Sequence, residues 1–306
     1  MTLLQLKYFI QAATSGSINK ASEVLYISQP GLSSALKELE AELGLELFKR
    51  TPKGITLTED GVEFLGYARQ VSEQASLLEQ RYLSKKPSRR LCSISTQHYA
   101  FAVNAFVNMV KKTNATEYEF TLRETRTYEI IEDVKTLRSE LGILYLNPFN
   151  RKVLEKIFWE NSLSFHPLFT AKPHIFVSST NPLASKDHVE LQDLEDYPCL
   201  SFEQGENNSF YFSEEILSAE RRRKSVKVTD RATIFNLMIG LDGYTISTGI
   251  VSADLNGENI VAVPLSIEDQ MEVGWLSHSS IQLTKQAELY LEELKSVISE
   301  YVALDL

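Results

Sequence analysis

The stretch from Ser17 to Leu43 constrains the fold most, because its pattern predicts two short helices joined by a tight turn at residues 26–27. In the second helix, leucines recur at i, i+4, i+7 and i+11 and form one stripe of an α-helix: Leu32, Leu36, Leu39 and Leu43. The first helix offers Ala21 and Leu25, one turn apart, for the two helices to pack on. Two short helices that brace each other across a tight turn are typical of a helix-turn-helix.

The face of the second helix opposite the leucines is small and polar. Ser34 points directly away from the leucine stripe, with Pro30 and Lys37 beside it and Ser33 on the flank. Small residues let the backbone approach a major groove, and serine and lysine side chains can bond base edges or phosphates. An ordinary helical hairpin with a solvated polar face fits the same residues, so both interpretations stay open at this point.

Residues 45–58 change the hydrophobic period. Ile55 and Leu57 alternate with polar residues, and the Thr-Pro-Lys-Gly run at 51–54 supplies turn chemistry, so a two-stranded ribbon is predicted. Three basic side chains lie on or beside this turn: Lys49, Arg50 and Lys53. A basic ribbon directly after a helix-turn-helix is a wing that meets the phosphate backbone beside the groove. This feature favours DNA binding over the plain hairpin.

The net charge of −10 is unusual for a nucleic-acid binder until the chain is divided. Residues 1–58 hold six basic and five acidic residues, a net charge of +1, so the remainder carries −11. Even the first part is only weakly basic, and strong binding would need paired modules and a locally focused patch.

A long helix is predicted from Thr58 to about Lys86, ahead of Pro87. Its apolar residues are spaced alternately four and three apart, as in a coiled-coil seam: Phe64, Ala68, Val71, Ala75, Leu78 and Tyr82. Such a seam favours a partner chain, with packing against the larger part of the same chain as the alternative. The polar run at 85–90 then predicts a hinge.

Beyond the hinge, strands alternate with helices. Apolar strand patterns at 91–95, 118–123 and 141–146 are separated by amphipathic helical stretches, which predicts an α/β fold with a parallel sheet.

Several classes of protein are disfavoured by what the sequence lacks. It contains no G-x-S-x-G, G-x-x-x-x-G-K-[ST] or G-x-G-x-x-G motif, and its five histidines show no paired metal-ligand spacing. We therefore expect no catalytic residues, no metal and no cofactor. No run of about 18 apolar residues is present, and Cys92 and Cys199 lie in apolar strand-like contexts, which favours buried thiols in a reducing, cytoplasmic location.

The first 58 residues closely resemble the DNA-binding domain of LysR-type transcriptional regulators. The resemblance lies in the stretches LKYFIQAATSGSINKASEVLYISQPGLSSALKELEAELGLELFKR and GITLTEDG. The order of winged helix-turn-helix, long helix and α/β region is similar to that family over the entire chain. Later stretches such as LRETRTYEII and NLMIGLDGYTISTGI resemble a subgroup from Gram-positive cocci, associated with cysteine and methionine metabolism and, in some members, with capsule or virulence genes.

This resemblance implies a domain plan. A winged helix-turn-helix domain would cover 1–58, a dimerisation helix with its hinge 59–90, and an effector-binding domain 91–306. The effector-binding domain would have two lobes of periplasmic-binding-protein type: 91–163 plus 265–306, and 164–264. The ligand would lie between these lobes and change how a homodimer or homotetramer bends promoter DNA.

The resemblance also implies DNA-contacting positions. They are Gln29, Pro30, Ser33, Ser34, Lys37, Arg50 and Lys53. The family often places arginine on this helix, whereas Ser34 and Ala35 stand in its middle here. Specificity would then depend more on Lys37, on close backbone approach and on DNA shape.

Effector-binding residues can be argued from topology as well. In open α/β sheets, ligands bind beyond the carboxyl ends of strands, near helix N-termini, which is where residues 95–97 and 125–127 lie. The resemblance aligns Thr96-Gln97 with a Thr-Gln pair that binds an anion in sulfur-responsive relatives, and His98 could line the same cleft. The expected effector-binding residues are Ser95, Thr96, Gln97, Thr125, Thr127, Asn208, Ser209 and Thr245. For each, a plain helix N-cap is the alternative.

These observations predict a DNA-binding transcriptional regulator that is not an enzyme. It would bind double-stranded promoter DNA, have no membrane partner, and respond to a small anionic metabolite of sulfur amino-acid metabolism, such as O-acetylserine or homocysteine, by resemblance. The alternative is a cytosolic small-molecule-binding protein or enzyme whose N-terminal helices serve only oligomerisation.

Overall fold

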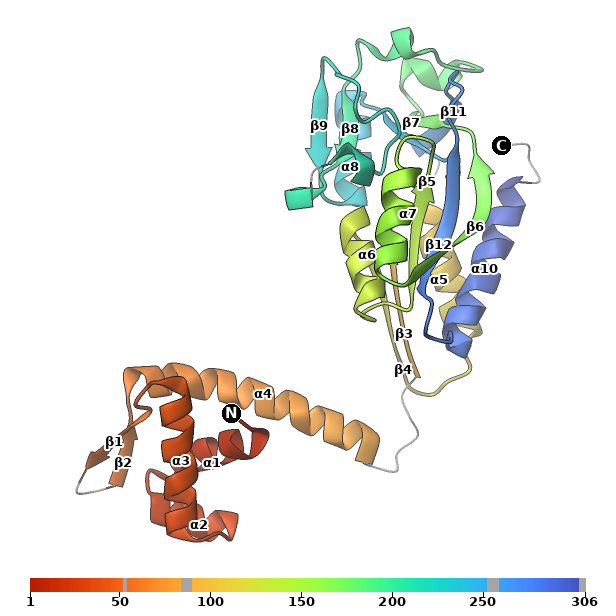
Figure 1. Cartoon of the computed structure of the whole chain (residues 1–306). Coiled ribbons are helices and arrows are strands. Elements are labelled where there is room, and N and C mark those ends of the chain that lie inside the picture. The colour runs from red at the N-terminus through yellow and green to blue at the C-terminus, as the bar shows by residue number, and fades with distance from the viewer. Residues whose placement is uncertain (52–53, 84–89, 208, 252–258, 303–306) are drawn as a thin grey trace. The chain divides into compact units, whose positions relative to one another are not determined.

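The computed structural model describes residues 1–51, 54–83, 90–207, 209–251 and 259–302 (Figure 1). The chain separates into two compact units, Met1–Ser88 and Arg89–Leu306. In the described residues, no helix is long and apolar enough to cross a membrane.

The first unit is a three-helix domain with a ribbon and a long helix. Its elements are α1 (Leu3–Ser15), α2 (Ile18–Leu25), α3 (Gln29–Leu43), β1 (Phe48–Thr51), β2 (Gly54–Leu57) and α4 (Glu59–Leu83). The ring of fully buried Phe9 lies 5.0 Å from the rings of Phe48 and Phe64, so one aromatic cluster joins α1, β1 and α4. The leucine stripe of α3 packs into the same core.

The predicted ribbon is confirmed, because β1 and β2 pair antiparallel from Phe48 opposite Leu57 to Thr51 opposite Gly54. The Ile55 N–H donates to the Gly16 carbonyl at the end of α1, 3.0 Å away. Gly54 has a φ of +134°, and a Cβ there would lie 2.4 Å from the Gly16 carbonyl oxygen. Only glycine can therefore bring the ribbon this close to α1.

The predicted seam of α4 is divided in the structure. Phe64 and Ala68 pack into the core of the first unit, and Ala68 is 2% exposed. Val71, Leu78 and Tyr82 are 47%, 60% and 72% exposed. The first turns of α4 are therefore covered by α1 of the same unit, which is neither the partner chain nor the larger part of the chain that the sequence suggested. The expected end of the helix at Lys86 falls outside the described residues.

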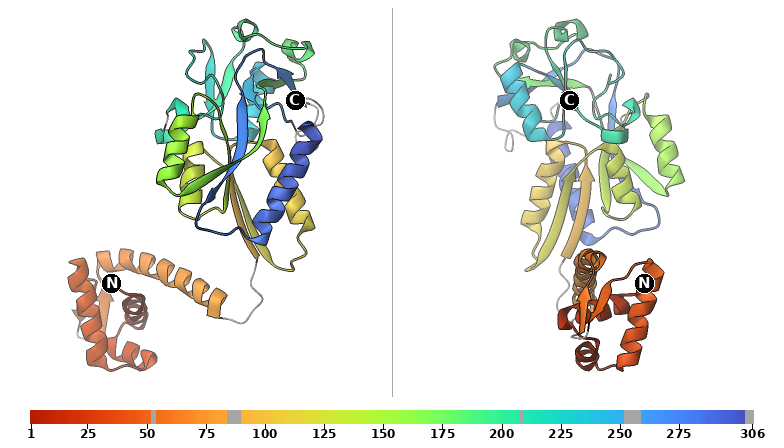
Figure 2. Two further views of the ribbon diagram at one scale, coloured as in Figure 1. Left: turned by 45° about the vertical axis from the view of Figure 1, so that its right-hand side comes forward. Right: turned by 90° about the vertical axis from the view of Figure 1, so that its left-hand side faces the viewer.

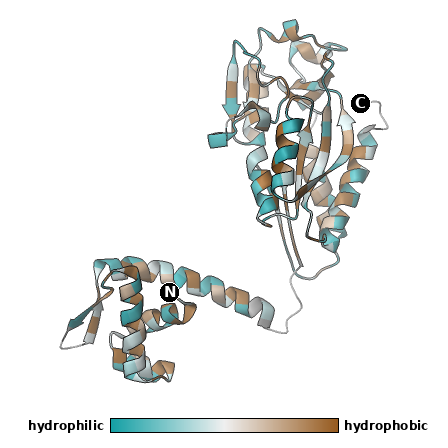
Figure 3. Cartoon of the chain, in the orientation of Figure 1, coloured by the Kyte–Doolittle hydropathy of each residue, from teal (hydrophilic) through white to brown (hydrophobic). Residues whose placement is uncertain are grey.

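The second unit is an α/β domain with a five-stranded sheet, in the order β4-β3-β5-β12-β6. Its strands are β3 (Arg90–Thr96), β4 (Tyr118–Glu124), β5 (Leu141–Leu146), β6 (Leu163–Ala171) and β12 (Met271–His278). Helices α5 (Ala100–Lys112) and α10 (Lys285–Val302) cover one face, and α6 (Thr127–Lys135) and α7 (Arg151–Glu160) cover the other (Figure 2). β5, buried along its whole length, is hydrophobic in Figure 3.

A second group of shorter elements follows β6 in the chain. It contains β7 (His174–Ser178), β8 (Cys199–Phe202), β9 (Ser225–Val228), α8 (Arg231–Leu241), β10 (Thr245–Ser247) and β11 (Ile260–Pro264), with short 3-10 turns at Pro182–Ser185, Leu191–Leu194, Gly205–Asn207 and Phe210–Phe212. β7 lies between β10 and β11 in an antiparallel sheet, and β8 pairs parallel with β9.

Two expectations about the second unit need correction. The sheet is parallel only across β4, β3 and β5, because β12 returns from the far end of the chain and pairs antiparallel with both β5 and β6. The expected lobe boundary between 163 and 164 also shifts. β6 pairs with β12 through Ala171, so residues 163–171 belong to the sheet of the first lobe.

Candidate functional site

The turn of the helix-turn-helix is built by the backbone of Tyr26. This residue ends α2 in the left-handed region with a φ of +54°, and its side chain is 95% exposed. Its N–H donates to carbonyls of the last turn of α2, and the Ile27 N–H donates to the Ser22 carbonyl. Ser28 then caps α3, since its hydroxyl accepts from the Gly31 N–H at 3.3 Å. The chain therefore reverses within a few residues and presents a new helix N-terminus.

Most of the residues expected to contact DNA lie on one exposed surface. Gln29, Pro30, Ser34 and Lys37 are exposed on α3, and Ser33 is half-buried beside them. Contact of these residues with DNA stays a prediction.

The ribbon is tied to this surface. The Arg50 guanidinium on β1 donates to the Ser33 hydroxyl at 3.3 Å, which fixes the wing against α3. Lys53 lies outside the described residues. Sequence reasoning overlooked Glu38, whose carboxylate accepts a hydrogen bond from Ser34 at 3.1 Å. This carboxylate lowers the positive potential of the surface, and only its spacing of four from Ser34 could have revealed it.

In the second unit, the expected effector residue Ser95 is enclosed by protein. It is fully buried, and its hydroxyl donates to Asp133 at 2.6 Å and lies 2.8 Å from the Ser139 hydroxyl. Ser95 therefore joins β3 to α6 and does not line a pocket, which corrects its expected role.

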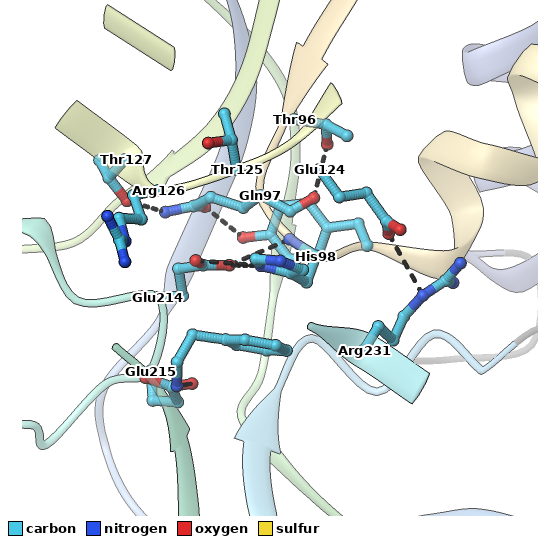
Figure 4. A network of polar contacts seen from close by, with 12 residues as sticks. Thr96, Gln97, His98, Glu124, Thr125, Arg126, Thr127, Glu214, Glu215 and Arg231 are labelled. Atoms are coloured by element: carbon cyan, nitrogen blue, oxygen red, sulfur yellow. Dashed lines mark hydrogen bonds and ion pairs between the residues drawn. The ribbon is translucent and has the colours of Figure 1, made fainter. Parts of the chain in front are cut away.

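Thr96, Gln97 and Thr127 are brought together, as expected from the topology, but they bind one another (Figure 4). The Thr96 hydroxyl donates to the Gln97 carbonyl at 2.8 Å, and the Gln97 amide donates to the Thr127 hydroxyl at 2.7 Å. The Gln97 amide oxygen accepts from the Tyr99 hydroxyl and from the Tyr145 N–H. All three residues are at most 1% exposed. The predicted anion site at Thr96-Gln97 is thus already satisfied by the protein's own groups.

The other expected effector residues are scattered. The Thr125 hydroxyl donates to Glu129 one turn along α6. Ser209 is exposed, and Asn208 lies outside the described residues. Thr245, at the start of β10, is 5% exposed and lines a pocket between the two lobes. Of the eight expected effector-binding residues, only Thr245 lines this pocket among those that the structure describes, and His98, also expected in the cleft, lines it too.

The pocket lies between the turn after β3 and residues of the second lobe. Aromatic and aliphatic side chains form most of its wall, and four acidic or basic side chains also line it: His98, Glu214, Glu215 and Arg231. We define this set of lining residues as the inter-lobe pocket. Ligand pockets of this composition, apolar with a few placed polar groups, are the usual small-molecule sites of proteins.

His98 and Glu214 form a buried pair across the lobes. His98 Nδ1 lies 2.9 Å from Glu214 Oε2, both side chains are 5% exposed, and the imidazole stacks on Phe202 at 3.9 Å. Burial by itself lowers the pKa of His98, but the Glu214 carboxylate outweighs it and raises the pKa above the usual histidine value. The two residues are 116 positions apart in the sequence, so no spacing rule could have found the pair.

Glu215 is a second buried carboxyl group beside Glu214. It is 7% exposed and accepts a hydrogen bond from the Phe202 N–H at 2.9 Å. Burial and the neighbouring Glu214 carboxylate raise the pKa of Glu215 to about 8. Nothing in the sequence indicated this group, because two consecutive glutamates usually lie on the solvent-exposed surface.

Arg231 opens α8 on the other side of His98 (Figure 4). Its Nε lies 3.2 Å from Glu124 Oε1, and its Nη1 is buried with no hydrogen-bond partner among the described residues. Burial raises the pKa of Glu124, although the Arg231 guanidinium opposes the shift.

A third ion pair joins the lobes. Arg126 Nη2 lies 2.9 Å from Glu203 Oε2, and its Nε donates to the Glu203 carbonyl. Beside them, the Thr127 N–H donates to the Gln204 side chain at 3.2 Å. In the parts of the chain that the structure describes, no group of three or more metal-ligating side chains gathers.

Comparison with known proteins supplies the context for both surfaces. Residues 3–62 match the family described as "Bacterial regulatory helix-turn-helix protein, lysR family", and residues 112–299 match the "LysR substrate binding domain". The HTH-type transcriptional activator CmpR of Synechocystis sp. is 25% identical, over 96% of this chain and 94% of that protein. The HTH-type transcriptional regulator CysL of Bacillus subtilis is 23% identical, over 95% and 96%.

Among solved structures, full-length CbnR complexed with its target DNA has a similar fold. Its TM-score is 0.52 at 18% sequence identity, and the match covers 97% of this chain and 100% of that chain. At this identity the likeness concerns the fold alone.

Proposed function

This chain belongs to the LysR family of DNA-binding transcriptional regulators, and we propose that it reads promoter DNA with α3 and the β1–β2 wing under the control of a metabolite in the inter-lobe pocket. The families matched are those of regulators rather than enzymes, so the alternative of an enzyme with an N-terminal assembly domain is set aside. The observation that carries the proposal is the hydrogen bond from Arg50 to Ser33, which holds a basic wing against the small polar face of α3.

The DNA surface follows from three properties. α3 presents Ser34 and Lys37 to solvent, its leucine stripe is buried on the opposite side, and the wing lies where it can meet the adjacent phosphates. We expect Gln29 and Pro30 at the start of α3 to approach the DNA backbone, as helix N-termini commonly bind phosphate. We propose that the domains follow the expected plan, with the boundary between the lobes moved to the end of β6 at Ala171. We also propose that two or four copies act together and that the protein works in the cytoplasm, where bacterial promoters lie.

The test is gel-shift binding to the DNA upstream of the protein's own gene. Lys37→Ala should raise the Kd roughly tenfold, because a contact to a base or phosphate is worth on the order of 1–3 kcal/mol. Ser34→Ala should have a smaller effect in the same direction. Lys7→Ala is the matched control, since Lys7 lies beside Glu79 of α4 and away from this surface. Equal Kd values for the wild type and for Lys37→Ala would reject the assignment of α3.

For the effector, we propose a small amino-acid derivative of sulfur metabolism, such as O-acetylserine or homocysteine. The support is the resemblance of several stretches of the second unit to regulators of cysteine and methionine metabolism. Thermal-shift measurements with these compounds test it, with Thr245→Val as the pocket variant. If neither compound raises the Tm of the wild type, the sulfur proposal is wrong.

A further inference from the structure

We propose that the inter-lobe pocket recognises its ligand by a cationic amine placed against Glu214 and Glu215, with the apolar body of the ligand against the aromatic wall. This inference rests on the proposed function, in which the pocket receives the regulatory metabolite, and it names the group that the pocket selects. It differs from the expectation of an anion bound at Thr96-Gln97.

The acidic and basic side chains that line the pocket favour a cationic ligand over an anionic one. Two of its four acidic or basic side chains are glutamates at consecutive positions, and these are 6% and 7% exposed. The basic groups opposite them are already engaged, since His98 lies 2.9 Å from Glu214 and Arg231 lies 3.2 Å from Glu124. An incoming carboxylate on this side of the pocket would meet the carboxyl groups of Glu214 and Glu215, with His98 already paired to Glu214, and a third acidic group is unfavourable in such a buried site.

Glu215 is the group left for a ligand. The His98 and Gln204 side chains both bind Glu214, at 2.9 Å and 3.3 Å. Glu215 instead accepts a hydrogen bond from the Phe202 N–H at 2.9 Å, and the nearby Lys227 ammonium does not cancel the increase in its pKa caused by burial and by Glu214. A buried carboxyl group whose hydrogen-bond donor is a backbone N–H is stabilised most by a cationic ligand, because a charge-assisted hydrogen bond is stronger than a neutral one.

The wall of the pocket favours the same class of ligand. Phe176, Phe202 and Phe235 line it together with aliphatic residues. Aromatic faces attract ammonium groups and also cover an apolar ligand body. The buried Nη1 of Arg231, which has no hydrogen-bond partner among the described residues, offers one donor at the other side of His98. A neutral or carboxylate oxygen elsewhere on the ligand could accept it, so amino acids are included in the class.

The experiment compares amines with acids of matched shape on the full-length protein without DNA. The probes are 3-(methylthio)propylamine against 4-(methylthio)butanoate, and 2-phenylethylamine against 3-phenylpropionate. We expect at least one amine to raise the Tm and to bind in calorimetry, and both acids to leave the Tm unchanged. Stabilisation by an acid alone, or by no amine at millimolar concentration, overturns the proposal.

Glu215→Gln identifies the residue responsible. It keeps an oxygen for the Phe202 N–H and removes the charge, so the variant should fold and bind the amine roughly tenfold or more weakly. Glu195→Gln, an exposed glutamate of the same lobe, is the control and should bind as the wild type does. Calorimetry near pH 7 in phosphate and Tris buffers adds a second readout. The wild type should release a proton on amine binding, because the ammonium favours the ionised Glu215, and the Glu215→Gln variant should not.

The outcome is separable from that of the proposed function. Amine binding that leaves DNA affinity unchanged would support the pocket chemistry and count against metabolite control. If Lys37→Ala did not change the Kd for DNA, the proposed DNA surface would be wrong, but the measured binding of amines to the pocket would still stand.

Discussion

Glu215 has a carboxyl group that water hardly reaches. Burial in the second lobe and the carboxylate of Glu214 raise its pKa to about 8, whereas its ordinary value is 4.5. The folded chain therefore holds a proton on this group at neutral pH that the unfolded chain releases. The ionisable groups around it are Glu214, His98, Lys227, Tyr99 and Tyr145.

This proton predicts a pH-dependent stability. Between pH 4.5 and about 8 the unfolded chain binds fewer protons at this position than the folded chain, so stability falls as pH rises. One such group changes the folding constant by up to about tenfold per pH unit. Glu215→Gln removes this dependence, and its stability advantage over the wild type should grow from pH 6 to pH 8. His98 acts in the same direction, because its raised pKa contributes stability that is lost as pH rises through it.

Urea unfolding followed by tryptophan fluorescence measures this effect. The chain has two tryptophans, Trp159 and Trp275, and both lie in the second unit. Glu195→Gln should follow the wild-type pH profile. Parallel profiles for the wild type and Glu215→Gln would show that Glu215 is ionised in the folded protein.

At the scale of single side chains, the sequence could place Thr96, Gln97 and Thr127 together but not decide what they bind. Their position followed from the rule that strand ends and helix starts meet at one edge of a sheet. The hydrogen bonds to the Gln97 amide oxygen come from Tyr99 and Tyr145, and Tyr145 lies on a different strand, β5. Glu214 and Glu215 could not be recognised as pocket residues, because their burial is set by segments far away in the chain.

Among the elements, the helix-turn-helix depends on a non-glycine residue in the left-handed region. Tyr26 adopts a φ of +54°, which costs an L-residue on the order of 1–2 kcal/mol, and its 95% exposed side chain gains no packing in return. Tyr26→Gly should therefore stabilise the α2–α3 pair by roughly 0.5–1 kcal/mol after the entropy of glycine is subtracted. Hydrogen exchange at the amides of Leu32 and Leu36 reports the change.

The control for this turn is a glycine at a right-handed helical position of the same helix. Lys20→Gly lies on α2 and should destabilise the same amides by roughly 0.7 kcal/mol. If Tyr26→Gly also lowers protection, the exposed ring of Tyr26 makes a contact that offsets its backbone strain.

Other elements show where periodicity is informative and where it is not. The leucine stripe of α3 and the ribbon were predicted correctly because each follows from local spacing. The apolar residues of α4 keep the same spacing along the whole helix, but their burial differs. α1 covers Phe64 and Ala68 and leaves Leu78 exposed. The antiparallel placement of β12 could not be predicted, because the strand is far from β5 and β6 in sequence and no local signal sets its direction.

For the whole molecule, the distribution of charge and the exposed apolar surface of α4 both favour the association of two chains. The residues of the first 58 carry only +1, against −11 in the remainder, so a single copy has little electrostatic affinity for DNA. The second half of α4 exposes Val71, Leu78 and Tyr82 on one stripe. A pair of chains joined along this stripe would double the phosphate contacts without any change in the charge of each chain.

Leu78→Glu tests this arrangement in the intact protein. A buried glutamate in the seam should shift the protein toward monomers in sedimentation experiments, since an unpaired charge is costly to bury. DNA affinity should fall at least tenfold, and the slope of log K against log salt should be roughly halved, because one wing instead of two then neutralises phosphates. Arg69→Glu introduces the same side chain on the opposite, exposed face of α4 and should leave the oligomer intact. Leu78→Glu with an unchanged oligomer and salt slope would mean that the exposed stripe of α4 is not where the copies meet.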